Sequence, residues 1–439
     1  MIKGKILIKG TITNKSPLHI GSGSDNRSDM DVLLDSTNRP YIPATSLTGV
    51  LRHTIELSED DQNHFWGYQA DQQNGKQSVF RCSDLETKTF QIKIRDGIKI
   101  NSQTGMIEKA NKFDYEIIEP GAMFSFKMEM GYTNTDEQTI KKSAATIYHL
   151  LSEGLAIGAK TNSGLGDIQI MTDKTMLYDF QFTNKQHVYE WLTRQYTENT
   201  RIESSDLGKP LQTKSQWNFS IEADLQLKNT LIVRSYSDKP KMPDAIHMQS
   251  NQEWVLPGTS LKGAIRARAE RIANMLGVPS IMDELFGYVK NQSDDNDSRQ
   301  SAAKGRILIK ETILPKFVAE LQTRIKIDRF TGGTIQSALF NSMPVFADIK
   351  NNVVKLSIQI RHCKPPDVGL ILLVLKDLWT QDLAVGGEKN IGRGVFQGLR
   401  ATITWNSDLF ILTDDLSQLS AGQKKLLQDC VDKLVLKDD

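Results

Sequence analysis

The chain has 439 residues, which is too long for one ordinary hydrophobic core, so we expect two or more domains. A hydrophobic content of 39%, a charged content of 24% and a net charge of +1 are typical of a globular protein and exclude a globally basic nucleic-acid-binding protein. The three cysteines are far apart, no apolar run approaches the roughly 20 residues of a membrane span, and the alternating N-terminus does not resemble a signal peptide. We therefore expect a soluble, cytoplasmic protein without a disulfide framework or a zinc site.

The predicted elements follow the same order twice along the chain. The first copy should contain strands at 5–12, 79–82 and 123–130, a helix from residue 46, and a second helix at 140–154. The second copy should contain strands at 217–227, 306–310 and 353–361, a helix from residue 260, and a second helix at 369–382. In each copy a long polar hairpin precedes the last of these strands, and a glycine-rich turn follows the second helix. This order favours an α+β fold of the ferredoxin-like or RRM type.

Four motifs recur in the same order, which indicates a tandem duplication. The paired segments are PYIPATSLTGVLR (40–52) with WVLPGTSLKGAIR (254–266), HFWGY (64–68) with ELFGY (284–288), IKINSQTG (98–105) with IKIDRFTG (325–332), and LAIGAKTNSGLG (155–166) with LAVGGEKNIGRG (383–394). The domains predicted from these pairs are a first domain at 1–175, a helix and linker at 176–214, a second domain at 215–412 and a C-terminal helix at 413–439. The polar stretch 290–305 should be a mobile loop.

The first repeated motif, P-x-T-S-L-x-G-x-x-R, predicts a helix whose N-terminus binds phosphate. Ser46 and Ser260 should be its N-caps, and free backbone N–H groups at a helix N-terminus favour an anion. The glycines inside the helix would allow another backbone to approach, and the basic residues could reach phosphate oxygens. The alternative is a plain capped helix packed tightly on a strand. The candidate contacts are Ser46, Gly49, Arg52, Ser260, Lys262, Gly263 and Arg266.

The two glycine loops are a second candidate for RNA contact. Successive glycines let main-chain amides line a concave anion-binding surface, although the Walker sequence is absent. The alternative is an ordinary tight turn between a helix and a strand. The residues that could contribute are Lys160, Asn162, Gly164, Lys389, Asn390, Gly392 and Arg393.

These motifs, together with PLHIGSG and RIKIDRFTGG, resemble the RAMP superfamily. More narrowly, the chain resembles the backbone subunits of type III CRISPR effector complexes, as a tandem two-copy fusion of the kind seen in subtype III-D. The resemblance implies two tandem RRM-like (ferredoxin-like) RAMP domains, each with a thumb hairpin and a glycine-rich loop. It also implies binding to CRISPR guide RNA, complementary target RNA, other RAMP subunits and the large signalling subunit of such a complex, and no membrane.

In such subunits a thumb hairpin pushes between guide and target and flips nucleotides out. By position, the thumbs here would be 93–118 and 320–345. Both contain a shared Thr-Gly pair, Thr104–Gly105 and Thr331–Gly332, which we take as RNA contacts. Apolar residues could wedge against splayed bases, and these are Met106, Ile107, Ile335 and Leu339.

The resemblance also implies an aspartate that cuts target RNA with the help of Mg²⁺ or another weakly held divalent metal. It would lie in the loop between the first strand and the repeated helix. In the first copy this loop holds Asp25, Asp29, Asp31 and Asp35, and the family pattern favours Asp29, with Asp31 second. In the second copy Asp244 has the comparable place and Asp238 is a weaker candidate. Asp29 and Asp244 would be the metal ligands.

Several alternatives stay open at this point. Aspartates are common in loops because they suit turns, and the chain could be a non-catalytic scaffold that binds guide RNA and neighbouring subunits. LIVRSYS replaces LHIGSG in the second copy, so His19, Gly21 and Gly23 have no evident equivalents there. His247 could assist Asp244 or be a solvated loop residue. Asp328, opposite Asn101, should have a role in local structure or in a thumb-specific contact rather than a shared catalytic role.

Overall fold

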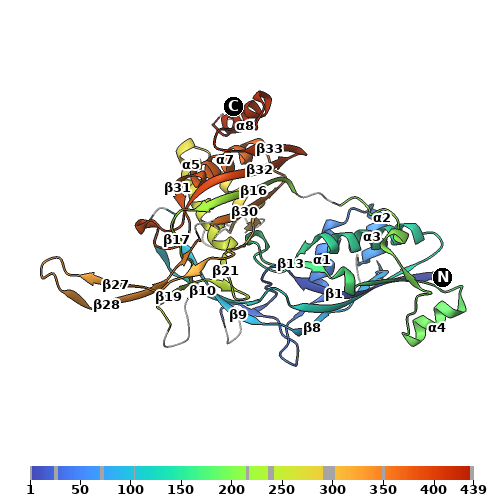
Figure 1. The fold of residues 1–439 in the computed structure, drawn as a ribbon. Coiled ribbons are helices and arrows are strands. Elements are labelled where there is room, and N and C mark those ends of the chain that lie inside the picture. The colour runs from blue at the N-terminus through green and yellow to red at the C-terminus, as the bar shows by residue number, and fades with distance from the viewer. Residues whose placement is uncertain are drawn as a thin grey trace. The chain divides into compact units, whose positions relative to one another are not determined.

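The computed structural model describes residues 2–23, 28–69, 74–102, 104–213, 217–235, 242–289, 302–348 and 352–435, which form two compact units (Figure 1). The first unit consists of Met1–Ile94, Asp114–Thr161 and Leu165–Ser215. The second consists of Arg95–Phe113, Asn162–Gly164 and Gln216–Asp439. Two segments of the first repeat therefore belong to the second unit.

The first unit is built on one antiparallel sheet. Its strands lie in the order β12 (Leu155–Ala156), β13 (Asp167–Ile170), β1 (Gly4–Asn14), β11 (Met123–Tyr132), β8 (Leu85–Thr89) and β4 (Tyr41–Ile42). β7 (Phe80–Cys82) also pairs with β11, and β14 (Met176–Gln181) pairs with β1 and with β15 (Arg201–Ile202). The helices are α1 (Ala44–Thr54), α2 (Glu59–Trp66), α3 (Glu137–Glu153) and α4 (Lys185–Thr193).

Both faces of β1 are covered. Ile6, Ile8 and Ile12 are fully buried in the main core, which also contains residues of α1 and α3. Leu7 points to the other face, where it packs with Phe180 and with aromatic residues that include Trp191 of α4. The strand therefore reads as alternating in sequence but has apolar contacts on both sides.

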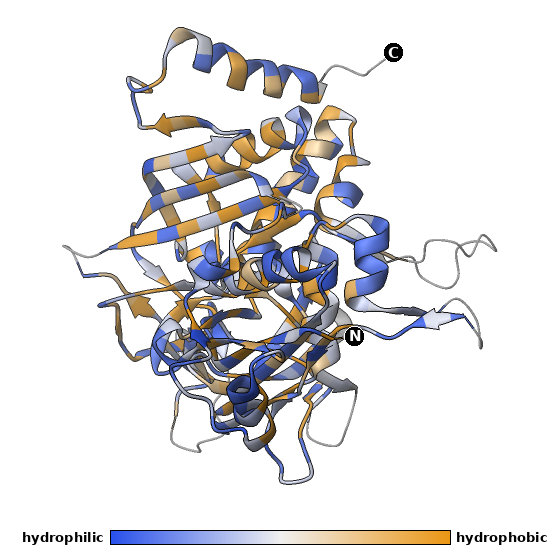
Figure 2. Cartoon of the chain, turned by 90° about the vertical axis from the view of Figure 1, so that its right-hand side faces the viewer, coloured by the Kyte–Doolittle hydropathy of each residue, from blue (hydrophilic) through white to orange (hydrophobic). Residues whose placement is uncertain are grey.

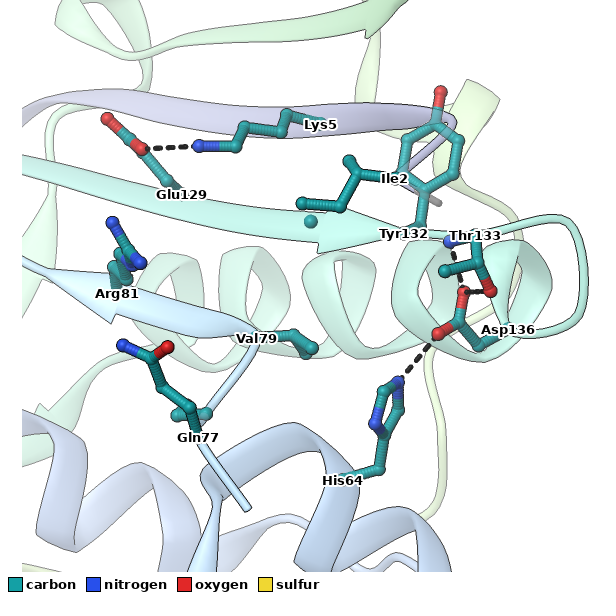
Figure 3. A pocket seen from close by; sticks show the side chains of 12 residues that line it. Ile2, Lys5, His64, Gln77, Val79, Arg81, Glu129, Tyr132, Thr133 and Asp136 are labelled. Carbon is teal, nitrogen blue, oxygen red and sulfur yellow. Dashed lines mark hydrogen bonds and ion pairs between the residues drawn. The ribbon is translucent and has the colours of Figure 1, made fainter.

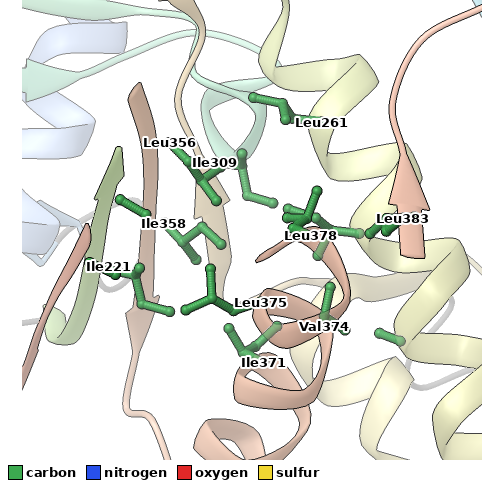
Figure 4. Packing of buried hydrophobic residues seen from close by; sticks show 14 of the residues in the cluster. Ile221, Leu261, Ile309, Leu356, Ile358, Ile371, Val374, Leu375, Leu378 and Leu383 are labelled. Atoms are coloured by element: carbon green, nitrogen blue, oxygen red, sulfur yellow. The ribbon is translucent and has the colours of Figure 1, made fainter. Parts of the chain in front are cut away.

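The second unit repeats this plan. Its strands lie in the order β24 (Ile307–Ile309), β30 (Val353–Arg361), β16 (Trp217–Leu227), β32 (Val395–Trp405) and β31 (Thr380–Ala384), and β33 (Asp408–Leu412) extends the edge at β32. The helices are α5 (Gly258–Leu276), α6 (Ile281–Phe286), α7 (Pro365–Trp379) and α8 (Ala421–Val435). Figure 4 shows Ile221 and Ile358 of the sheet facing Ile371 and Leu375 of α7 across the core.

The two sheets share one topology. The central strands are β8-β11-β1-β13 in the first sheet and β24-β30-β16-β32 in the second. Numbered along each repeat, both read 2-3-1-4, which is the ferredoxin-like order. This confirms the predicted fold class. Bands of hydrophobic and hydrophilic residues run along the strands in Figure 2, as expected for half-buried sheets. The predicted strands at 217–227 and 353–361 have these same bounds in the structure.

The predicted thumbs are antiparallel hairpins. The first is β9 (Ile92–Ile100) with β10 (Ile107–Ile118), and the second, which Figure 1 shows as a long projecting hairpin, is β27 (Gln322–Ile327) with β28 (Thr334–Met343).

The shorter elements are β2 (Gly21–Gly23), β3 (Asp31–Val32), β5 (Tyr68–Gln69), β6 (Gly75–Lys76), β17 (Thr230–Leu231), β18 (Arg234–Ser235), β19 (Ala245–His247), β20 (Gln249–Ser250), β21 (Glu253–Leu256), β22 (Gly287–Val289), β23 (Ala302–Lys304), β25 (Thr312–Ile313), β26 (Val318–Ala319), β29 (Val345–Phe346) and the 3-10 turns Thr161–Ser163, Thr172–Lys174, Ser204–Leu207 and Lys389–Ile391.

Three sequence predictions fall outside the described residues. They concern Asp25, Asp238 and most of the polar stretch that was expected to form a loop, residues 290–301. Among the described residues, no helix combines the length and the apolar character that a membrane crossing requires.

Candidate nucleic-acid interface and cleavage loops

Asp29 lies at the base of the first thumb, just before β3. Its Oδ2 accepts the backbone N–H of Asp114 at 3.0 Å, and the Asp114 carboxylate accepts the backbone N–H of Asp29 at 2.8 Å. Asp114 belongs to β10, the second strand of the thumb. Asp29 is exposed, so this reciprocal pair of hydrogen bonds holds an accessible carboxylate against the thumb.

Asp244 has the same relationship to the second thumb. Its Oδ2 accepts the backbone N–H of Asn341 at 2.8 Å, and Asn341 belongs to β28. Asp244 is also exposed and precedes β19, which pairs with β28. The side chain of Asn341 is engaged elsewhere, because its Oδ1 accepts the hydroxyl of Thr323 at 2.8 Å. Among the residues that the structure describes, the second site therefore has one carboxylate, Asp244, where the first has Asp29 and Asp114.

Strand register makes Asp29 and Asp244 equivalent. Gly21 lies opposite Val32 in the first repeat, and Arg234 lies opposite His247 in the second. Two residues after Asp29 the first repeat has Asp31, and two residues after Asp244 the second has Ile246. Asp31 is fully buried and accepts the hydroxyl of Ser28 at 2.6 Å. The structure thus brings Asp29 and Asp244 to matching exposed places and Asp31 into the interior.

His247 is neither a solvated residue nor an assistant of Asp244, so that expectation is wrong. It is fully buried, its Nδ1 accepts the backbone N–H of Val233 at 3.0 Å, and its Nε2–H donates to the carbonyl of Val255 at 2.9 Å. Burial lowers its pKa to about 4, so the ring is neutral at pH 7. Asp35 is held in a turn, where the N–H groups of Arg39 and Thr37 and the Thr37 hydroxyl lower the pKa of its carboxyl.

The loops fit a weakly held hard cation. Among the described residues, no group of three or more histidine, cysteine, aspartate or glutamate side chains lies close enough to hold a metal ion. Mg²⁺ commonly uses one or two carboxylates and completes its shell with water and substrate phosphate. The exposed oxygens at Asp29 and Asp244 suit that arrangement, whereas a metal caged by protein ligands alone would need more of them.

The helix that was expected to bind phosphate begins earlier than predicted. α1 and α5 start at Ala44 and Gly258, and their N-caps are Pro43 and Pro257 rather than Ser46 and Ser260. Each proline has an extended ψ, and the carbonyl of Pro43 already accepts the N–H of Ser46 at 3.0 Å. The hydroxyls are therefore on the third helical residue, and no side chain caps either helix from the N-cap position.

The glycines inside these helices face open space. Gly49 and Gly263 are exposed, and a Cβ atom added at either would meet no described atom within 4 Å. The glycines themselves therefore do not pack on a strand, whereas Leu47 of α1 and Leu261 of α5 are buried in the cores. Thr45, Gly49 and Arg52 lie on one helix face, at i, i+4 and i+7, and each is exposed. Such a face can receive another backbone.

Lys262 does not extend that face. Its Nζ lies 3.3 Å from the carbonyl of Asn162 and 3.4 Å from that of Ile307, all within the second unit. Burial, with the nearby charges of Arg266, Lys304 and Arg361, lowers its pKa to about 8. Arg266 is exposed, and its Nη2 lies 3.5 Å from the carbonyl oxygen of Gly287.

The glycine loops are tight turns with one backbone plan. The N–H of Ala159 donates to the carbonyl of His19 at 2.9 Å, and that of Gly387 donates to Ile232 at 2.7 Å. The next residues, Lys160 and Glu388, both have a φ of 56°. The sequence therefore places a cation and an anion at one equivalent position. Lys160 lies over the ring of Tyr115 at 4.5 Å, and burial lowers its pKa.

The tips of the two loops have different surroundings. Asn162 is buried in the second unit, where its Nδ2 donates to the carbonyl of Gly305 at 2.5 Å and its Oδ1 accepts Arg361 at 2.7 Å. Gly164 fits against the backbone of Lys310 and Glu311. In the second repeat, by contrast, Lys389 and Asn390 are exposed, Gly392 is half-buried, and Arg393 is buried.

The thumb tips are matching turns. The side chain of Asn101 accepts the N–H of Thr104 at 2.9 Å, and Asp328 accepts that of Thr331 at 2.8 Å. This confirms the local role predicted for Asp328. Gly105 and Gly332 both have a φ of +68°, which favours glycine. Each hairpin carries exposed apolar side chains, which are Met106, Ile107, Ile325, Phe330 (99% exposed) and Leu339. Sequence reasoning missed Phe330, although it lies next to the Thr-Gly pair.

A pocket in the first unit that contains two charged pairs does not belong to this interface. Figure 3 shows its internal pairs, Lys5 with Glu129 (3.3 Å) and His64 with Asp136 (2.6 Å). Both carboxyls have a pKa below the usual value. The effect of burial is outweighed at Glu129 by Lys127 and then Lys5, and at Asp136 by the N–H of Thr133 and then His64. No residue of the predicted RNA-binding or catalytic sets lines the pocket.

Comparison with known proteins gives one family. The family model described as the RAMP superfamily matches residues 11–169 and 245–397, one region in each repeat and together more than half of the chain. No curated protein matches the chain.

Proposed function

Because the chain belongs to the RAMP superfamily, whose members are RNA-binding subunits associated with CRISPR complexes, we propose that it is a backbone subunit of a type III effector complex that binds guide RNA and cleaves the paired target RNA, with one site per repeat. The observation that carries this proposal is the equivalence of Asp29 and Asp244. Each is an exposed carboxylate fixed to the second strand of a thumb. Two such sites predict two cuts at a fixed spacing.

The residues suit a reaction in which RNA supplies its own nucleophile. The 2′-oxygen attacks the adjacent phosphorus, the bond from phosphorus to the 5′-oxygen breaks, and the products are a 2′,3′-cyclic phosphate and a 5′-hydroxyl. The proton of the 2′-hydroxyl passes to water, and the leaving 5′-oxygen takes one from water. A divalent cation held by Asp29 or Asp244 would supply positive charge for the phosphate. The protein's main contribution is then an in-line geometry set by the thumb.

RNA binding rests on the open helix faces and on the thumbs. The faces that contain Gly49 with Arg52 and Gly263 with Arg266 would receive the guide backbone, since nothing in the described chain covers them. The apolar thumb residues would lie between splayed bases, as inserted apolar side chains do in other complexes. Phe330 is the most exposed of them.

The test uses the assembled complex, Mg²⁺ and labelled complementary RNA. Asp29→Ala should abolish one cut and Asp244→Ala the other, each with unchanged guide binding, and the control Asp173→Ala, an exposed aspartate outside both loops, should leave both cuts. An unchanged cleavage ladder in both variants would refute these assignments. If the wild-type complex binds target but never cuts it, the non-catalytic scaffold is the correct function.

A further inference from the structure

Three arginines of the second unit converge on Glu388, whose side chain is 7% exposed. Nη2 of Arg234 lies 3.0 Å from Oε1 of Glu388, and Nη1 of Arg324 and Nε of Arg393 lie 2.7 and 2.8 Å from Oε2. The hydrogen bonds from these arginines outweigh burial and lower the pKa of Glu388, so it is ionised. Three guanidinium groups and one carboxylate leave this arginine cluster with an excess of two positive charges.

Only part of the cluster is committed to the protein interior. The side chain of Arg393 is 3% exposed, and it also donates to Thr230 at 2.9 Å and to Gln322 at 2.5 Å. The side chains of Arg234 and Arg324 are 41% and 36% exposed. A guanidinium has five N–H donors, and among the described residues Arg234 makes one hydrogen bond through them. Donors therefore remain for an anion from outside.

The cluster lies at the base of the second thumb. Arg324 pairs with Phe340 across the hairpin, and the guanidinium of Arg234 lies 5.4 Å from the centre of the Phe340 ring. The next residue, Asn341, donates its backbone N–H to Asp244. Arg234 and Arg324 thus contact Phe340 of β28, and the candidate cleavage residue Asp244 contacts the next residue of that strand.

The first repeat lacks every member of the cluster. The equivalent positions hold Gly21, Gly97, Lys160 and Leu165, yet its glycine loop has the same backbone hydrogen bonds. The cluster is therefore not needed to shape the loop. At Gly97 a Cβ atom would lie 2.4 Å from the ring of Phe113, so a side chain there would require the ring to move. The first repeat has one cation, Lys160, at these positions, so the two exposed arginines are a property of the second repeat alone.

We propose that Arg234 and Arg324, oriented by Glu388, bind a phosphodiester of an RNA strand beside Asp244. This deepens the proposed function and rests on it, because it names a contact that the first repeat does not have. Guanidinium groups match phosphate oxygens in a planar, bidentate geometry, and a buried carboxylate that fixes one edge leaves the other edges preorganised. The second repeat thereby binds RNA backbone at a place where the first offers glycine.

The test is a titration of the full chain with guide RNA, alone and paired to complementary RNA, at several salt concentrations. Arg234→Gln combined with Arg324→Gln should weaken binding about tenfold and reduce the slope of log affinity against log salt by about 1.4, or about 0.7 for each lost contact to a single strand. The control is Arg201→Gln, because Arg201 is 40% exposed and paired to Glu198 in the first unit. Its binding and slope should match the wild type.

The two RNA forms separate the possible sources of the phosphate. A loss with guide alone assigns it to the guide, and a loss only with paired RNA assigns it to the target, and both results support the site. If the double variant has a lowered melting temperature, the single variant Arg234→Gln replaces it in the test, because Glu388 then stays paired to Arg324 and Arg393. Wild-type affinity and slope in folded variants would overturn the inference. If the wild type itself does not bind RNA, the proposed function fails first.

Discussion

The Arg95 guanidinium and the Glu311 carboxylate form a buried bidentate ion pair, although 216 residues separate them in sequence. Nη1 lies 2.6 Å from Oε2, Nη2 lies 3.1 Å from Oε1, and the two side chains are 2% and 8% exposed. Arg95 begins the thumb segment of the first repeat that belongs to the second unit. The pair therefore anchors the first thumb on residues of the second repeat.

Removing one member of this pair should destabilise the second unit strongly. Glu311→Ala leaves a buried guanidinium without its counter-charge, which typically costs about 3–5 kcal/mol. Denaturant unfolding measures the loss, and Lys310→Ala, at the exposed neighbour, should change stability by less than about 0.5 kcal/mol. Replacing both partners, as Arg95→Met with Glu311→Leu, should recover much of the loss. Equal stability of the Glu311 and Lys310 variants would contradict the ion pair's role.

Substituting the helix glycines should separate stability from RNA binding. Gly49→Ala and Gly263→Ala place a methyl group in open space, so each should stabilise the fold by up to about 1 kcal/mol. The same methyl group should weaken guide-RNA binding if a backbone approaches there. Thermal unfolding and RNA titration on the same samples test both effects. Gly422→Ala, in α8 with similarly open surroundings, should leave RNA affinity unchanged. Unchanged affinity in all three variants would refute the contact.

Acid should destabilise the second unit through His247. Its pKa is lowered from the ordinary 6.5 to about 4 by burial, so the folded state resists protonation that the unfolded state accepts. Its contribution is complete above pH 6.5 and is lost as the pH falls towards 4, by about 3 kcal/mol in total. Unfolding free energy measured from pH 7 to 4.5 should therefore fall steeply in the wild type. The less stable His247→Gln variant should show a flatter profile, and parallel profiles would argue against this source.

Asp29 and Asp31 should have opposite phenotypes. Asp31→Asn disturbs a buried carboxylate that accepts the Ser28 hydroxyl, so it should lower stability by about 1–3 kcal/mol and preserve the first cut below the melting temperature. Asp29→Asn should abolish that cut with little effect on stability, since the side chain is exposed. Loss of the cut in a fully stable Asp31→Asn variant would reverse the assignment.

Patterns of local sequence predicted the fold class and three strands of each sheet. The alternation in Trp217–Leu227 and Val353–Arg361 gave the strands with their correct bounds, because each residue's side is set by the two-residue period of a strand. Repeated Thr-Gly pairs located both thumb tips. The capping prediction failed at Ser46 because an extended proline, Pro43, already ends the preceding strand and starts the helix.

Contacts between residues far apart in sequence could not be predicted in this way. Asn162, Lys262 and Arg393 are of residue types that commonly bind phosphate. Each instead forms a hydrogen bond with a group from a distant segment of the chain. The pairing of Arg95 with Glu311 joins residues of different repeats that are 216 positions apart, so no local pattern indicates it. Strand register, which a sequence does not state, makes Asp29 rather than Asp31 the equivalent of Asp244, which is the order of preference that the family pattern already gave.

The assignment of Arg95–Phe113 and Asn162–Gly164 to the second unit has a consequence for how the two repeats can be inherited. A gene cut at the linker would yield a second half without the side chain of Asn162, which satisfies Arg361 and Gly305, and without the partner of Glu311. Fusion therefore fixes the stoichiometry of the repeats at one to one and their order along any bound strand. Both candidate cleavage sites then lie in one polypeptide, so a single gene sets the length of chain between them.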